Sequence, residues 1–278
     1  MPAQTMGLVL FAALLHAGWN ALIRSSADRT LDAALVAGGA GAAALAALPF
    51  LAAPAPAALG FMVASGAIHV VYMLLVGAIY ERGQMSVAYP LMRGSAPLMT
   101  ALGGAIFLSE RLSAFGWAGV ALTCGGVLGL AATATARRGG APTGLALLNA
   151  GVIASYTLVD GAGVRASGSP VAYTLWTLLL GGAPVVLIVM RRRGREFWRH
   201  LRSRWGKGLA GGCANAAAYA LVLHAMTQAP VAAVAALRET SIVFAMAISA
   251  VFLKERLTPA RLLASLSIAC GASLLRLA

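Results

Sequence analysis

Charged residues are scarce in this sequence, and acidic residues are the scarcest. Asp, Glu, Lys and Arg make up 10% of its 278 residues, whereas a typical soluble domain has about 25%. Hydrophobic residues make up 60%, and the mean hydropathy is +0.84. A chain of this composition cannot cover a folded core with polar side chains, which excludes a soluble globular domain. We therefore predict an all-α membrane protein whose helices contact lipid.

Groups that usually carry enzyme chemistry are also few. Cys124, Cys213 and Cys270 each lie within an apolar run, which favours packing over a disulfide or a metal site. The four histidines have no H-x-x-x-H or H-E-x-x-H spacing, and the sequence has neither a D-x-x-D cluster nor a G-x-x-x-x-G-K-[ST] phosphate-binding loop. We expect no bound metal or cofactor, no catalytic activity and no ATP coupling within this chain.

Long apolar runs, by contrast, follow one another along the whole sequence. Stretches of about 20 apolar residues between turn or charge signals predict membrane-spanning helices. The first run lacks the basic start and the cleavage site of a secretory signal, so we expect it to be retained as the first span. Ten spans are predicted, near residues 6–23, 31–52, 58–80, 84–108, 113–132, 142–160, 170–190, 206–227, 230–253 and 258–276.

An internal repeat divides these spans into two halves. Residues 107–112 read FLSERL, and residues 252–257 read FLKERL, which is 145 positions later. At the same offset Arg93 matches Arg238, so two charged positions within apolar helices share one spacing. We predict two five-helix repeats, residues 1–136 and 142–278. Because each has an odd number of spans, the two repeats are inverted with respect to each other.

Basic residues are concentrated on one side of this arrangement. The odd-numbered loops carry 16 of the 21 Lys and Arg residues, which predicts that these loops are cytoplasmic and that both termini lie outside. Half of the basic residues in these loops lie in one segment, residues 191–207. Between two spans, such a tryptophan-containing basic segment favours a juxtamembrane anchor on anionic lipid over nucleic-acid binding.

The repeated segments resemble a known family. FLSERLS (107–113), followed by WAGVALTCGGVLGL (117–130), and FLKERLT (252–258) are similar to the EamA-type members of the ten-helix drug/metabolite transporter superfamily. The resemblance implies passage of amino acids, metabolites, nucleobases or drugs across the membrane, often as export. It also implies cytoplasmic termini, opposite to the charge count, so the orientation stays open. HAGWN (16–20) resembles a subgroup associated with phosphonate utilisation.

Polar residues within the spans are candidates for a transport path, since a polar side chain in lipid needs a partner or a water-filled cavity. They fall in six of the spans, numbers 1, 3, 4, 6, 8 and 9. The other four spans are expected to face lipid or the second subunit of a homodimer. The candidate substrate-binding residues are Trp19, Asn20, Tyr72, Tyr89, Arg93, Tyr156, Asn215, Tyr219 and Arg238. The candidates for proton coupling or ion pairing are His16, His69, Asp160 and Glu239.

Arg93 and Arg238 carry two competing interpretations. Either arginine pairs with Asp160, Glu239 or Glu81 and locks helices together, or the two guanidinium groups bind an anionic group of the substrate. The two coexist if an ion pair opens when substrate arrives. Glycine pairs with G-x-x-x-G spacing, Gly125–Gly129 and Gly208–Gly212, indicate close helix contacts.

These features predict a secondary transporter of the bacterial inner membrane. It would move a small polar, anionic or zwitterionic metabolite by alternating access, with Pro-interrupted helices 4 and 9 supplying the bending. Its partners would be this small-molecule substrate and membrane lipids, not nucleic acid. The alternative is a lipid-handling or scaffold protein without a transport cycle.

Overall fold

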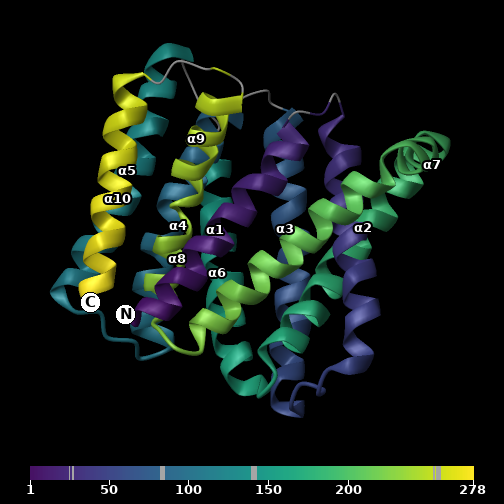
Figure 1. The fold of residues 1–278 in the computed structure, drawn as a ribbon, viewed down its shortest axis with the longest axis horizontal. Coiled ribbons are helices and arrows are strands. Elements are labelled where there is room, and N and C mark those ends of the chain that lie inside the picture. The colour runs from purple at the N-terminus through teal and green to yellow at the C-terminus, as the bar shows by residue number, and fades with distance from the viewer. Residues whose placement is uncertain (25, 27, 82–84, 139–142, 253, 255–257) are drawn as a thin grey trace.

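The computed structural model describes residues 1–278 apart from 25, 27, 82–84, 139–142, 253 and 255–257 (Figure 1). Every element in the described part of the chain is a helix. The α-helices are α1 (Ala3–Arg24), α2 (Arg29–Ala47), α3 (Leu59–Glu81), α4 (Met85–Phe107), α5 (Ala114–Arg138), α6 (Thr143–Ser167), α7 (Pro170–Met226), α8 (Val231–Arg238), α9 (Ser241–Phe252) and α10 (Pro259–Leu277). Two short 3-10 helices, η1 (Leu48–Phe50) and η2 (Pro56–Ala58), connect α2 to α3.

Helices are the expected outcome for such apolar segments, because a helix satisfies its own backbone hydrogen bonds where no water is present. Among the described residues, eight segments are long and apolar enough to cross a membrane. They are Ala3–Ile23, Arg29–Phe50, Pro56–Ile79, Ala114–Thr133, Thr143–Ser167, Pro170–Met226, Val231–Val251 and Pro259–Leu277. The chain is therefore an all-helical, multi-pass membrane protein. Helix α4 is absent from this set because Arg93 and two prolines lower its hydropathy.

Helix α7 is too long to cross a membrane once. Its 57 residues rise about 85 Å, whereas the apolar core of a bilayer is about 30 Å thick. At Gly194 the backbone leaves helical geometry, with φ 46° and ψ −119°, a left-handed φ that glycine adopts without strain. The helix folds back at the place where Figure 1 carries the label α7, so α7 has two limbs, one before this fold and one after it. The expected loop at 191–207 is therefore wrong: these residues are helical and form what we call the α7 apex.

The predicted span over 230–253 corresponds to the candidate span Val231–Val251, but it is not one continuous helix. Helix α8 ends at Arg238, Glu239 and Thr240 form a turn, and α9 begins at Ser241. The backbone N–H of Glu239 donates to Ala236 O and that of Thr240 donates to Leu237 O, which tightens the last turn of α8. Arg238 thus lies at the end of a helix, and Glu239 follows it in the break. All eight residues of α8 are buried, which places this short helix at the centre of the packed core.

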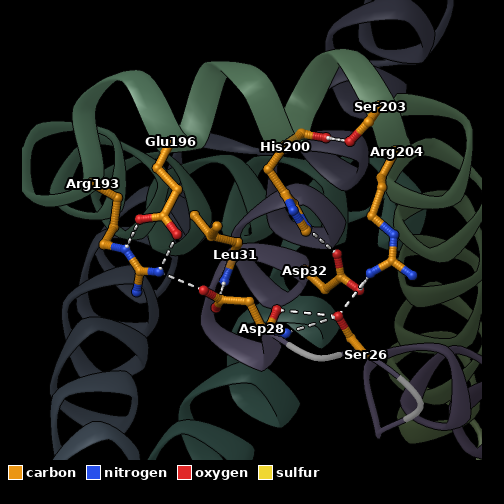
Figure 2. A network of polar contacts seen from close by, with 9 residues as sticks. All are labelled: Ser26, Asp28, Leu31, Asp32, Arg193, Glu196, His200, Ser203 and Arg204. Atoms are coloured by element: carbon orange, nitrogen blue, oxygen red, sulfur yellow. Dashed lines mark hydrogen bonds and ion pairs between the residues drawn. The ribbon is translucent and has the colours of Figure 1, made fainter.

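Contacts between segments far apart in sequence define two rims of the bundle. On the first rim the Met1 ammonium donates to Arg276 O, Thr5 donates to Gln228, and Ala55 N–H donates to Ser167 O. On the second rim, Asp28 and Asp32 at the start of α2 bind residues of the α7 apex (Figure 2). The α7 apex and the chain termini therefore lie at different rims.

Glycines set the closest helix contacts. A Cβ added at Gly208 would lie 2.9 Å from Leu35 Cβ, and one at Gly212 would lie 2.7 Å from Gly39 Cα, so both glycines of this pair face α2. Gly125 and Gly129 have open space instead, and the expectation of close contacts there is wrong. In α5 the close approach is made elsewhere: a Cβ at Gly126 would lie 2.9 Å from Ala264 O of α10.

Candidate functional site

A buried ion pair lies at the break between α8 and α9. Arg93 Nη2, from the middle of α4, is 2.9 Å from Glu239 Oε1, and the two side chains are 9% and 2% exposed. Arg238 is buried beside them and also interacts electrostatically with Glu239. Two guanidinium groups therefore face one carboxylate, and the charge balance of this group is positive.

Four atoms of this group form no hydrogen bond to the residues that the structure describes. They are Arg93 Nε, Arg93 Nη2, which meets Glu239 only as an ion pair, Arg238 Nε and Glu239 Oε2. An unmet hydrogen bond on a buried charged group costs more than the roughly 1–3 kcal/mol of a neutral one, so such atoms call for water or a ligand. The geometry combines the two interpretations of the arginines, since Arg93 has a carboxylate partner while both guanidinium groups keep donors to offer.

A second polar cluster surrounds Asp160 of α6, which is fully buried. Its carboxylate accepts a hydrogen bond from the Tyr173 hydroxyl at 3.0 Å and another from the Tyr219 hydroxyl. Tyr173 is on the first limb of α7 and Tyr219 on the second, so one carboxylate binds both limbs. No ion pair joins Asp160 to an arginine in the described part of the chain.

Aromatic rings connect the two clusters. The His69 ring stacks on Tyr156 with centroids 4.2 Å apart, and Tyr156 meets Tyr72 edge to face at 5.9 Å. Tyr72 in turn interacts electrostatically with both Arg93 and Arg238. Tyr219 interacts with both Asp160 and Arg238. Together with Tyr89, which is electrostatically coupled to Arg93, these residues form one polar region between α3, α4, α6, α7 and α8.

Four further candidate residues lie on α1 and on the second limb of α7. In α1 the Asn20 amide donates to His16 O, and the His16 ring meets Trp19 edge to face at 5.0 Å, so these three form a local group. Asn215 is half-buried on α7. The side chain of Glu81, one expected partner of the arginines, lies outside the described residues.

Tyr173 was missed by reasoning from the sequence. Its span, 170–190, was expected to carry no strong polar group and to face lipid, and this is wrong because Tyr173 is fully buried against Asp160. The same expectation is wrong for α2, where Asp32 is buried and binds His200 and Arg204 of the α7 apex. An available signal was the presence of a Tyr and an Asp in the first turns of these two spans.

The repeated glutamate of FLSERL also has a role that its motif did not reveal. Both oxygens of Glu110 accept the backbone N–H of Val231 at 3.0 and 2.9 Å, and Arg165 donates to Oε1 at 2.6 Å. Arg165 also donates to Met226 O and Ala229 O. Glu110 thus caps the N-terminus of α8 and fixes the helix that carries Arg238. Its counterpart Glu255 lies outside the described residues.

The side chains of this region are suited to the recognition of charged groups. Guanidinium groups bind carboxylate or phosphonate oxygens through two parallel hydrogen bonds, and tyrosine hydroxyls add further polar contacts. No group of three or more His, Cys, Asp or Glu residues that could hold a metal ion is found in the described residues.

Comparisons with known proteins agree with a transport protein. One solved structure, titled "Crystal structure of protein", is similar over 100% of this chain and 98% of its own, with a TM-score of 0.73 and 20% identity, which shows a shared fold. No curated protein sequence matches significantly. Residues 143–277 match the model of the EamA-like transporter family, as the resemblance of FLKERLT implied. The second half of this multi-pass membrane protein is therefore similar to the EamA-like transporter family.

Proposed function

We propose that the chain is a secondary transporter of the bacterial inner membrane that moves a small anionic or zwitterionic metabolite. The observation that carries the proposal is Arg238: its guanidinium is buried, shares Glu239 with Arg93, and keeps an Nε donor without a partner among the described residues. An incoming carboxylate, phosphonate or similar group would restore the charge balance and accept these donors.

The proposal includes ten spans in two inverted halves, residues 1–136 and 142–278. Counting the two limbs of α7 separately and adding α4 to the eight candidate spans supports ten crossings. Helices α5 and α10, which hold matching ranks in the two halves, pack against each other through Gly119, Gly126 and Gly271. Alternating access would then be a rocking of the halves about the region between them, with the break after α8 and the prolines of α4 as points of bending.

Transport by arginine variants in proteoliposomes tests the anion site. Purified protein is reconstituted and offered a panel of labelled amino acids, organic acids and phosphonates. We expect Arg238→Gln to lower the rate for the best substrate by about 10- to 100-fold, since a charge-assisted hydrogen bond contributes roughly 1.5–3 kcal/mol. The matched control is Arg111→Gln, which alters an exposed arginine at the α4–α5 connection and should keep the wild-type rate.

The variants must first elute as monodisperse protein with wild-type helical content. If folded Arg238→Gln and Arg93→Gln both transport at the wild-type rate, these arginines do not bind the substrate. If the wild type moves no member of the panel, the alternative of a lipid-handling or scaffold protein is favoured instead.

Asp160 and His69 are the groups that we propose for proton coupling, because a buried carboxylate that accepts two tyrosine hydroxyls is placed to gain and lose a proton beside the anion site. A pH gradient across the same vesicles should change the wild-type rate at least about threefold, the order expected for a step driven by a modest proton-motive force. The Asp160→Asn variant should give one rate with and without the gradient. An equal response of both proteins would remove Asp160 from the coupling.

A further inference from the structure

The α7 apex separates its charges between two faces. Toward α2 it presents Arg193, His200 and Arg204, and acidic partners meet all of them (Figure 2). Arg193 binds Asp28 and also Glu196 of its own helix, at 2.7 Å from Nε. Phe197 on this side is buried against Leu31 and Leu35. The inner face of the apex is thus a neutralised, packed contact with α2.

The acidic groups of this contact are fully engaged. Burial raises the pKa of the Asp28 carboxyl, but the Leu31 N–H and the Arg193 guanidinium outweigh this effect and hold the pKa below its usual value. The hydrogen bonds from Arg193 likewise lower the pKa of Glu196. Both carboxylates are therefore ionised at neutral pH, and their charge is balanced by the inner arginines.

The outer face of the apex carries cations without a bound acidic partner. Arg195, Arg199 and Arg202 are exposed, and none forms an ion pair within the described part of the chain. Arg199 interacts with Glu196 through electrostatics alone, and the Glu196 carboxylate is bound by Arg193. Their spacing of three to four residues places them on one side of the helix. With Trp198 and Ser203 they line an open hollow of about 600 Å³. Trp198 is 52% exposed within this set.

The position of the hollow indicates its occupant. The apex joins two apolar limbs of α7, and the connection between two such segments is expected where they leave the lipid, at the depth of the headgroups. Exposed tryptophans, here Trp198 and the 64% exposed Trp205, are typical of this depth. Three unpaired guanidinium groups at the headgroup level complement a lipid phosphate in charge and in geometry.

We propose that the hollow formed by Arg195, Trp198, Arg199, Arg202 and Ser203 binds the headgroup phosphate of an anionic phospholipid. The arginines contact the phosphate oxygens, and the Trp198 ring covers the glycerol and the start of the acyl chains. The bound lipid is part of the surface of the protein at the α7 apex, and it holds this rim at the anionic leaflet.

Brominated phospholipids test this site, because bromine quenches the fluorescence of a tryptophan that it contacts. Purified full-length protein in neutral detergent is titrated with brominated phosphatidylglycerol, which is anionic, and with brominated phosphatidylcholine, which is zwitterionic. We expect saturable quenching by the anionic lipid at a concentration about tenfold or more below that of the zwitterionic one. Replacing Trp198 by phenylalanine should remove the saturable component. Equal quenching by the two lipids would overturn the proposal.

Charge variants locate the site. The triple variant R195Q/R199Q/R202Q should need about a hundredfold more phosphatidylglycerol for half-saturation. For the charge-preserving R195K/R199K/R202K, the phosphatidylglycerol concentration at half-saturation should stay within about tenfold of the wild-type value. For Arg111→Gln at the opposite rim it should equal the wild-type value. If the glutamine variant does not fold, the proposal is still tested by the wild-type preference for phosphatidylglycerol over phosphatidylcholine and by the affinity of the lysine variant. Wild-type affinity in a folded glutamine variant contradicts the proposal, as does displacement of the lipid by millimolar inorganic phosphate, which would indicate a site for a soluble anion.

Discussion

Glu239→Gln is expected to lower the free energy of unfolding by roughly 3–5 kcal/mol. The change keeps the shape of the side chain but removes the negative charge that Arg93 and Arg238 share. Both guanidinium groups would then remain buried with no anion beside them, and removing one partner of a buried ion pair is among the most costly single substitutions. Thermal unfolding of the purified protein in detergent, followed by circular dichroism, measures the loss.

The matched control is Glu196→Gln, the same chemical change in an ion pair of the α7 apex. Glu196 is 42% exposed and its partner Arg193 is 35% exposed, so water screens the pair and the expected loss of stability is far smaller than for Glu239→Gln. A double variant, Arg93→Met with Glu239→Met, should be less destabilised than Glu239→Gln alone, because it removes a cation together with its anion. If Glu239→Gln unfolds at the same temperature as Glu196→Gln, the buried ion pair of Arg93 and Glu239 does not stabilise the fold.

Gly212→Ala is expected to disrupt the contact between α2 and α7. A Cβ at this position would lie 2.7 Å from Gly39 Cα and closer still to Ala40 N, and these are backbone atoms that cannot rotate away. Overpacking of a core usually costs about 1–3 kcal/mol, and a clash with a helix backbone belongs at or above the top of this range. The expected result is a much lower yield of monodisperse protein in fluorescence-detected size-exclusion chromatography, and a lower melting temperature for what is recovered.

Gly206→Ala provides the comparison within the same helix. No atom lies within 4 Å of a Cβ built at Gly206, so the added methyl group is tolerated. Replacing glycine by alanine in a helix is worth roughly 0.5–1 kcal/mol in favour of alanine, so this variant should be as stable as the wild type or slightly more so. Equal yields and melting temperatures of Gly212→Ala and Gly206→Ala would mean that the close contact between α2 and α7 does not stabilise the fold.

Most helix positions could be predicted because lipid imposes a simple rule on composition. The predicted span 6–23 corresponds to α1 (Ala3–Arg24), and 258–276 corresponds to α10 (Pro259–Leu277). An apolar run must form a helix where the backbone has no other hydrogen-bond partner, and its length is set by the bilayer. These are local properties, and a single sequence carries them. The family, too, was predictable from FLKERLT, which lies within the matched residues 143–277.

The α7 apex and the break after α8 could not be predicted, since both depend on distant residues. The charges of 191–207 indicated a loop, but ion pairs to Asp28 and Asp32 and the burial of Phe197 stabilise a helix there. Neither Gly nor Pro marks the break at Glu239, which faces Arg93 from a helix 146 positions earlier in the chain. Tertiary contacts override local preference at these sites.

The candidate site was predictable in its residue types, and Glu239 was among the named partners of Arg93, but the tyrosine partners of Asp160 were not predicted. Arg93, Arg238 and Asp160 stood out because a charge within an apolar helix needs a reason. Which hydroxyl meets Asp160 depends on how the first limb of α7 is rotated, and a tyrosine in an apolar run gives no indication of that rotation. Tyr173 therefore became visible as a site residue only once both limbs were placed.

The two limbs of α7 are linked to each other at both of their ends. At the apex its two limbs are joined by continuous chain, and near the other end each limb reaches the same Asp160 carboxylate through one tyrosine, Tyr173 or Tyr219. The ionised carboxylate accepts a hydrogen bond from each of the two hydroxyls. A proton on one of its oxygens occupies a lone pair there and weakens that oxygen as an acceptor. Protonation of this one carboxyl group is therefore expected to weaken the contact that ties the two limbs of α7 to α6.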